Sequence, residues 1–137
     1  MVFVDSWAWL EVTLPGERVS QARAILERGE HEGIVVSTTV LTEVYYVLSR
    51  EKGERSAERA MEMIRRFESL TVLPVTEEIA IHAARLRRTY YSQSNDRTPS
   101  YADAINLATA IAVAECDRLC TGDSDFEDVS EITSEVF

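Results

Sequence analysis

The sequence predicts an α/β fold, in the form of a three-layer α/β/α sandwich around a largely parallel sheet of short strands. Short β-branched and apolar runs alternate along the chain with longer segments of helical periodicity, and glycine, proline or hydroxyl residues separate them. Strands joined through helices run parallel because each connection must cross the sheet. No repeat or linker interrupts the 137 residues, so we expect a single domain over 1–137.

The first half of the chain contains two strand-then-helix units. Apolar, β-branched runs predict buried strands at 1–4 and 34–36. Carboxylate or hydroxyl side chains follow both runs, and such residues favour the start of a helix. Gly29 and Gly53 are expected to end the two longer helices, because glycine readily adopts the left-handed conformation that follows a helix. The helices expected here are a short one at 6–10, one at 19–28, and one from the hydroxyl caps at 37–39 to about 52.

The second half repeats this alternation around one polar interruption. Residues 54–70 place apolar side chains at helical spacing, with arginines and glutamates on the other face. The segment Ser92–Ser100 is polar, contains Pro99 and is predicted to be a loop. The other elements expected are a strand at 71–75, a helix at 76–90, a helix at 101–114, a strand at 118–121 and a last short strand near Ile132.

Charge and cysteine content restrict the classes of function. Acids outnumber bases 24 to 14, and the net charge of −10 opposes nucleic-acid binding unless metal ions or a local arginine patch reverse its sign. Cys116 and Cys120 have too few companions for a zinc site or a disulfide framework, so we expect buried free thiols. The first residues lack a basic segment, and no apolar stretch reaches membrane-spanning length. We therefore expect a soluble, cytoplasmic protein without membrane contact.

Four carboxylates lie where an isolated charge is costly. Asp5 and Asp123 follow predicted strands, Glu43 is the only charge in VLTEVYYVL, and Asp103 is the only charge in YADAINLATAIAVA. Burial of a lone carboxylate costs several kcal/mol, so each of these acids needs a partner. Pairing with a distant arginine remains open for each acid taken alone. Convergence of all of them on Mg²⁺ or Mn²⁺, which prefer oxygen ligands, is the simpler explanation.

Nearby polar residues are candidates for orienting these acids. Asn106 lies three residues after Asp103 and shares its helix face, so it could hold Asp103 or a water. A hydrogen bond between two helices is the alternative for Asn106. Ser6 and Thr121 are placed to orient the neighbouring carboxylates, although Ser6 also fits a plain helix cap.

The order of these motifs resembles that of the PIN domain, and especially of the VapC toxins of bacterial and archaeal toxin–antitoxin pairs. The matching segments are VFVDS, VLTEV, YADAINLATA and TGDSDF, which together extend from Val2 to Phe126. The resemblance implies an α/β/α sandwich and an endoribonuclease that depends on Mg²⁺ or Mn²⁺ and leaves 5′-phosphate and 3′-hydroxyl ends. It also implies a homodimer, and an antitoxin whose tail blocks the acidic site.

The same resemblance assigns roles by position. Asp5 and Asp103 match the principal metal ligands, and Glu43 and Asp123 match the remaining catalytic acids, of which Asp123 is also assigned to the metal.

Two further residues of the last motif receive supporting roles from the resemblance. Thr121 matches a hydroxyl that precedes the acids, and Asp125 matches a position that often serves structure. The loop at 93–100 is long and polar for this family, which leaves open which residues guide the substrate on that side.

Arginines just before and within this loop form the candidate RNA-binding surface. They are Arg85, Arg87, Arg88 and Arg97. These arginines would contact phosphates while Tyr91 stacks on an unpaired base. A solvated helix face with Tyr91 at its edge is the alternative, and the one that the sequence favours. The competing function is a catalytically silent PIN-like module that binds protein or RNA, and the full set of carboxylates argues against it.

Overall fold

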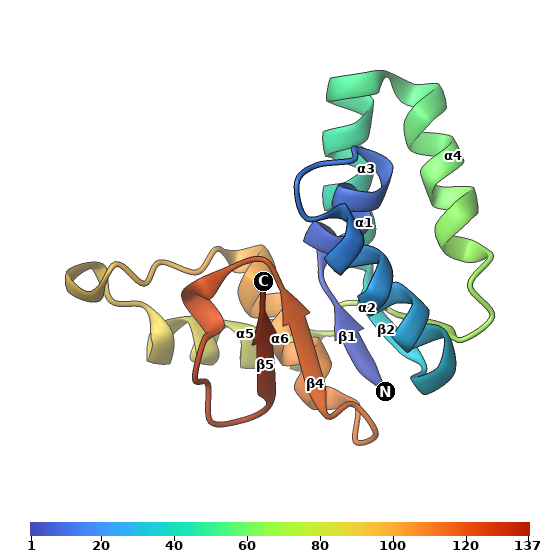
Figure 1. Cartoon of the computed structure of the whole chain (residues 1–137). Coiled ribbons are helices and arrows are strands. Elements are labelled where there is room, and N and C mark those ends of the chain that lie inside the picture. Colours follow the sequence, from blue (N-terminus) through green and yellow to red (C-terminus); the bar gives the residue numbers. More distant parts are fainter.

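A computed structural model describes all 137 residues and contains one parallel sheet with the strand order β3-β2-β1-β4-β5 (Figure 1). The strands are β1 (Val2–Val4), β2 (Ile34–Ser37), β3 (Leu70–Leu73), β4 (Arg118–Thr121) and β5 (Thr133–Val136). The helices are α1 (Ser6–Thr13), α2 (Val19–Glu32), α3 (Thr38–Lys52), α4 (Glu54–Arg65), α5 (Glu77–Tyr90) and α6 (Tyr101–Ala112), with short 3₁₀ turns η1 (Gln93–Asn95) and η2 (Ser124–Phe126). The predicted α/β sandwich with a parallel sheet is confirmed.

The helices cover both faces of the sheet. Figure 1 shows α2 in front of β1 and β2, and α5 and α6 behind the sheet. Helices α3 and α4 pack on each other as a hairpin, and α3 also contacts α1 and α6. The sheet is therefore the middle of three layers, and its central strands are screened from water on both sides.

Strand β1 occupies the centre of the sheet, and later strands are added on both sides of it. Strands β2 and β3 lie on one side of β1, whereas β4 and β5 lie on the other. Val4 pairs with Cys120, and the Asp5 N–H donates to the Cys120 carbonyl at 3.1 Å. The carboxyl ends of β1 and β4 therefore lie side by side where the strand order reverses, which is the usual ligand-binding position in open parallel sheets.

The core is one cluster of 30 buried residues that includes every residue of β1. Trp9 is fully buried and packs edge-on against Phe67, with ring centroids 5.2 Å apart. Cys116 and Cys120 belong to this core and are free thiols, as expected from the sequence.

Two of the predicted element ends are wrong. Helix α2 does not stop at Gly29 but continues to Glu32, and Gly33, with φ of 90°, follows it as the cap. Gly29 lies inside the helix, where a Cβ would be only 2.5 Å from the Ile34 side chain. Close packing, rather than backbone conformation, requires this glycine.

The helix expected at 54–70 ends at Arg65, and Leu70 already belongs to β3. Phe67 keeps the helical spacing of the apolar residues but is held by Trp9, and Leu70 pairs with Ile34 in the sheet. Tertiary contacts therefore override the local periodicity in this segment. Smaller differences occur at α1, which extends to Thr13, at α6, which ends at Ala112, and at β5, which begins at Thr133.

None of the helices combines the length and the apolar character that crossing a membrane would require.

Candidate active site

Asp5 directly follows β1 and caps the N-terminus of α1, where its Oδ1 accepts a hydrogen bond from the Trp7 backbone N–H at 3.0 Å. The cap is thus Asp5 and not Ser6. Burial raises the pKa of Asp5 from 3.8 to about 7; hydrogen bonds from the Thr121 hydroxyl and the Trp7 backbone oppose this rise, whereas the charges of Glu43 and Asp103 add to it. No cationic side chain is among the groups that lower this pKa, and Asp5 takes part in no ion pair.

Thr121 ends β4 and is almost completely buried. Its hydroxyl hydrogen-bonds to Asp5, and its Oγ1 accepts a hydrogen bond from the Asp123 N–H at 3.0 Å. Thr121 therefore positions two of the predicted site acids, each from a different strand end.

Asp103 is half-buried in the first turn of α6 and forms a capping box with Ser100. Its Oδ2 accepts hydrogen bonds from the Ser100 N–H at 2.8 Å and from the Ser100 hydroxyl at 2.7 Å. From the sequence, a metal ion or a distant arginine was expected as the partner of Asp103, and these local hydrogen bonds were not anticipated. The motif Ser100-x-x-Asp103, which is a known helix-start signature, could have revealed the capping box.

Asp123 and Asp125 belong to the turn around η2. The Oδ1 of Asp123 accepts the Asp125 N–H at 2.9 Å, and the Oδ1 of Asp125 accepts the Thr98 N–H at 3.1 Å. One carboxylate oxygen from each of Asp103, Asp123 and Asp125 lies within 4.8 Å of the others. Burial raises the pKa of Asp125, and the charges of Asp123 and Asp103 raise it further. This trio groups Asp125 with the predicted ligands, although the sequence gave it only a supporting role.

Glu43 approaches the same region from α3. It is half-buried, and its Oε2 is buried without a hydrogen-bond partner. Burial and the charge of Asp103 raise the pKa of Glu43, while hydrogen bonds from Ser6 and Asn106 lower it. An unpartnered buried carboxylate oxygen is costly, and here it lies among other acids.

Asn106 is held by a residue that the sequence did not single out as part of the site. The hydroxyl of Ser37, which is fully buried, donates to Asn106 Oδ1 at 2.7 Å. Because Asn106 also hydrogen-bonds to Glu43, the contact with Ser37 holds the amide that supports Glu43. Ser37 was expected only as a cap of α3, which it also is, and no sequence pattern indicated its second role.

We call Asp5, Glu43, Asp103, Asp123 and Asp125 the acid cluster. A small cavity of about 10 Å³ lies between Asp5 and Asp103, with Asn106, Leu119, Thr121 and Phe126 as its other walls. This volume is close to what one water molecule occupies.

No member of the acid cluster takes part in an ion pair. Hard divalent cations prefer such a set of carboxylate oxygens, and an unpartnered buried oxygen and a carboxyl with a pKa of about 7 both fit a missing positive charge.

The residues predicted to contact RNA differ in their surroundings. Arg85 and Arg88 are exposed on α5, and Tyr91, just after α5, is 40% exposed. Arg97 is placed differently from expectation: its guanidinium donates to the backbone carbonyls of Asp125 and Glu127. Arg97 therefore holds the loop before α6 against the turn that carries the acids.

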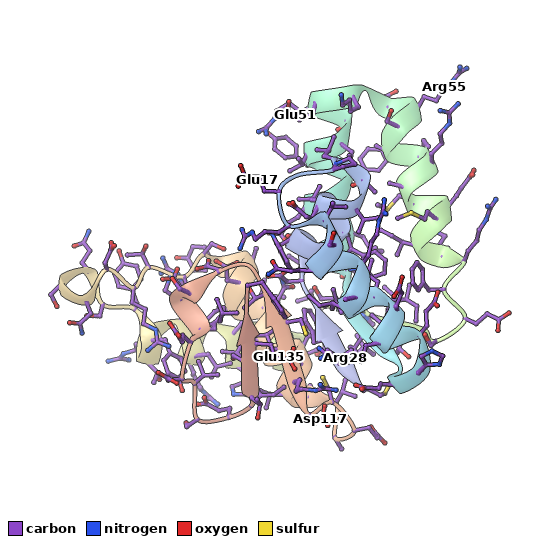
Figure 2. All side chains as sticks on the ribbon, viewed as in Figure 1. Glu17, Arg28, Glu51, Arg55, Asp117 and Glu135 are labelled. Atoms are coloured by element: carbon purple, nitrogen blue, oxygen red, sulfur yellow. The ribbon has the colours of Figure 1, made fainter.

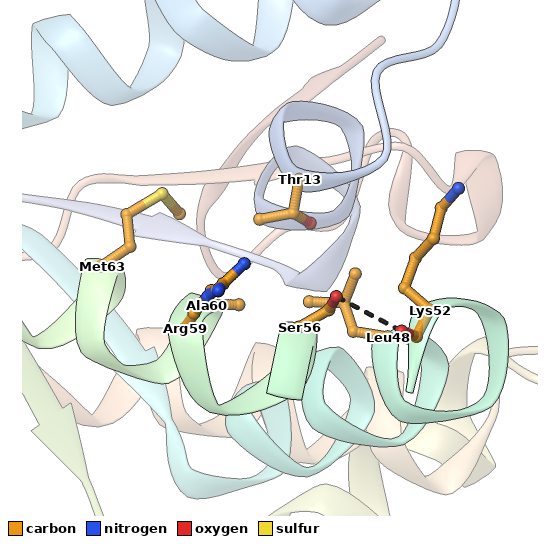
Figure 3. A pocket seen from close by; sticks show the side chains of 7 residues that line it. All are labelled: Thr13, Leu48, Lys52, Ser56, Arg59, Ala60 and Met63. Atoms are coloured by element: carbon orange, nitrogen blue, oxygen red, sulfur yellow. Dashed lines mark hydrogen bonds between the residues drawn. The ribbon is translucent and has the colours of Figure 1, made fainter. Parts of the chain in front are cut away.

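A larger hollow lies away from the acid cluster, between the end of α1 and the α3–α4 hairpin (Figure 3). Its volume is about 340 Å³, and Lys52 and Arg59 supply its charged side chains. Within it the Ser56 hydroxyl donates to the Lys52 carbonyl at 3.3 Å, the contact drawn in Figure 3. No carboxylate lines this hollow, so it has no ligand for a metal ion.

Comparison with known proteins identifies the family of the chain. Residues 2–132 match the family model of the PIN domain. The chain therefore belongs to the PIN domain family, and the resemblance noted in the sequence is confirmed. No curated protein matches the sequence.

Solved structures with the same fold come from toxin–antitoxin systems. The toxin VapC20 of Mycobacterium tuberculosis, described as cleaving the sarcin–ricin loop, superposes with a TM-score of 0.76 at 21% identity, over 96% of this chain and 97% of that one. VapBC2 of Rickettsia felis, bound to a DNA fragment from its promoter, gives a TM-score of 0.74 at 16% identity, over 100% and 99%. A toxin–antitoxin complex from Klebsiella pneumoniae gives 0.70 at 20% identity, over 97% and 96%.

Proposed function

We propose that this PIN-domain protein is a metal-dependent endoribonuclease that hydrolyses RNA phosphodiester bonds, and that it is the toxin of a VapBC-type pair. One observation carries the proposal: five carboxylates gather where the sheet reverses its strand order, and no ion pair neutralises any of them. Membership of the PIN family and the fold shared with VapC toxins support it.

Mg²⁺ or Mn²⁺ would be held by oxygens of Asp103, Asp123 and Asp125, with Asp5 across the small cavity from Asp103. When bound, such an ion supplies an activated water near neutral pH and positive charge for the phosphoryl oxygens. A divalent cation would offset part of the negative charge of these four carboxylates and offer a direct partner to phosphoryl oxygens, which would lessen the repulsion between an acidic chain and a polyanionic substrate.

The protein's own groups have separate tasks in this proposal. Thr121 and the backbone of Trp7 fix the carboxyl of Asp5, so that it remains aimed at the cavity. The Asn106 amide steadies Glu43, and Ser37 in turn holds the Asn106 amide, so that the carboxyl of Glu43 would stay beside the metal ligands.

Cleavage of single-stranded RNA in the presence of Mn²⁺ or Mg²⁺ tests the function. We expect Asp5→Asn and Asp103→Asn each to lower kcat/KM by roughly 100-fold or more, because each removes charge that the transition state needs. Glu17→Gln is the matched control, since Glu17 is exposed and makes no hydrogen bond or ion pair. An Asp5→Asn protein that cleaves at the wild-type rate would contradict the assignment.

A cognate antitoxin and a homodimer complete the proposal. Several proteins of the same fold were solved as complexes with antitoxins, which supports an antitoxin partner for this chain. A hollow between α3 and α4, lined by the half-exposed Leu41 and Tyr45 and the exposed Tyr46, would supply a surface for a second copy. Induced expression in a bacterial host should arrest growth, and co-expression of the antitoxin should restore it.

A further inference from the structure

Two tyrosines flank an arginine beside the acid cluster, and we call Arg87, Tyr91 and Tyr101 the tyrosine–arginine patch. The guanidinium carbon of Arg87 lies 4.3 Å from the ring centroid of Tyr101 and 4.8 Å from that of Tyr91. Arg87 Nε also donates to the Pro99 carbonyl at 2.9 Å. Tyr101 is nevertheless 70% exposed and Tyr91 40%, so both rings are held in place and still offer surface to a ligand.

Three successive residues connect the patch to the acid cluster. The Thr98 N–H donates to Asp125, the Pro99 carbonyl accepts from Arg87, and Ser100 donates to Asp103. Tyr101 follows immediately as the first residue of α6, two positions before Asp103. An RNA strand whose phosphate lies at the acid cluster would therefore meet the patch with a neighbouring nucleotide.

The charges around the patch favour a polyanion. Arg85, Arg87 and Arg88 form no ion pair, whereas the arginines that do are Arg28, Arg50 and Arg118. In a chain with a net charge of −10, these three arginines of α5 thus keep a positive charge that no carboxylate side chain pairs with. Phosphate groups of a nucleic acid are suitable partners for them.

We propose that the tyrosine–arginine patch is a base-binding subsite, where an unpaired RNA base stacks on Tyr101 while Arg85 and Arg88 contact the backbone. This inference rests on the proposed endoribonuclease function and adds base-contacting residues to it. The exposed ring of Tyr101 can stack on a base that is free of a partner, whereas the bases of a duplex are already stacked on their neighbours.

Fluorescence of 2-aminopurine in a short single-stranded RNA tests the subsite, because stacking quenches this base. Binding is measured in an Asp5→Asn background, so that the RNA is not consumed. We expect strong quenching at one position of the RNA. Adding Tyr101→Phe, which keeps the ring, should preserve it, whereas adding Tyr101→Leu should abolish the quenching and weaken binding about tenfold.

Tyr46 provides a matched control within the same chain. It is 60% exposed and has Arg50 over its ring at 5.4 Å, but it lines a separate hollow between α3 and α4 that includes no member of the acid cluster. Tyr46→Leu should leave the quenching and the affinity unchanged, provided light scattering shows the same association state as the parent protein.

Two results would overturn the subsite: quenching and affinity that survive Tyr101→Leu, or equal binding of a fully paired duplex of the same length. The proposed function fails differently. A wild-type protein that does not cleave RNA with any divalent metal would contradict the nuclease, while base quenching that depends on Tyr101 would still support the subsite.

Discussion

The carboxylates next to the two faces of strand β4 differ in whether a positive charge compensates them. On one face, Leu119 and Thr121 line the cavity of the acid cluster. On the other face, Cys120 lies beside Glu135, whose carboxylate binds Arg28 at 2.7 Å and Arg118 at 3.1 Å. Figure 2 shows Arg28 and Glu135 side by side. The alternation of side chains along a strand thus separates the two environments by a single residue.

The pKa values report the difference. Burial alone would raise the pKa of Glu135, but hydrogen bonds and attraction from Arg28 and Arg118 lower it overall. The pKa of Asp5, by contrast, rises to about 7 because burial and neighbouring acids outweigh its hydrogen bonds. The ionised carboxylate of Glu135 therefore stabilises the folded protein, whereas the ionised carboxylate of Asp5 destabilises it. That cost is expected where a cation must bind.

The largest stability effect should come from neutralising Asp5 in metal-free protein. Its folded pKa lies above its unfolded value, so its contribution is most favourable below pH 4 and is lost as the pH rises through 7. Asp5→Asn, which retains the helix cap, should therefore stabilise the apo-protein increasingly between pH 4 and pH 8. The full pKa shift corresponds to about 4 kcal/mol, and partial exposure to solvent reduces the expected gain to roughly 2 kcal/mol.

Urea unfolding in the presence of EDTA, at several values of pH, measures this gain. Glu17→Gln serves again as the exposed control and should change stability by less than about 0.5 kcal/mol. If the difference in unfolding free energy between Asp5→Asn and wild type did not depend on pH, the pKa of Asp5 would not be raised by folding.

The contribution of Glu135 to stability should depend on pH in the opposite direction. Its folded pKa lies below its unfolded value, so its stabilisation is present at neutral pH and is lost as the pH falls through the folded pKa, below about 4.5. Glu135→Gln should destabilise the protein by about 1.5 kcal/mol at pH 7, because both arginines lose a half-buried partner. The difference from wild type should vanish in acid.

The exposed pair Arg50–Glu51 supplies the control for this prediction, since both side chains are at least half exposed. Glu51→Gln should be nearly neutral at every pH. RNA cleavage by Glu135→Gln should remain at the wild-type rate under conditions where the variant is folded, and a lost activity would mean that the two faces of β4 are coupled.

The smallest effect, and the one that separates an enzyme from a silent binding module, concerns divalent metal. About 1 mM Mn²⁺ should stabilise the wild-type protein by about 1 kcal/mol, or roughly 3 °C in Tm. Asp103→Asn should abolish the shift, whereas Glu135→Gln should keep it. A wild-type Tm that does not respond to Mn²⁺ or Mg²⁺ would favour the silent module.

The sequence alone determined the order of strands and helices and the carboxylates to consider. Apolar runs and their spacing depend on local physics, which is why the α/β class could be predicted, and Asp5 and Asp123 could be placed at strand ends. Glu43 attracted attention because its neighbours are mostly apolar. These inferences needed no knowledge of contacts between distant residues.

Only the tertiary structure decided which distant side chains contact each other and which polar groups obtain hydrogen-bond partners. Arg97 binds the backbone carbonyls of Asp125 and Glu127, and Ser37 reaches Asn106 across 69 residues. Gly29 likewise serves the close approach of Ile34 rather than a helix end. Each of these outcomes depends on the packing of elements far apart in the chain, and local periodicity carries no information about which side chains that packing brings within hydrogen-bond distance.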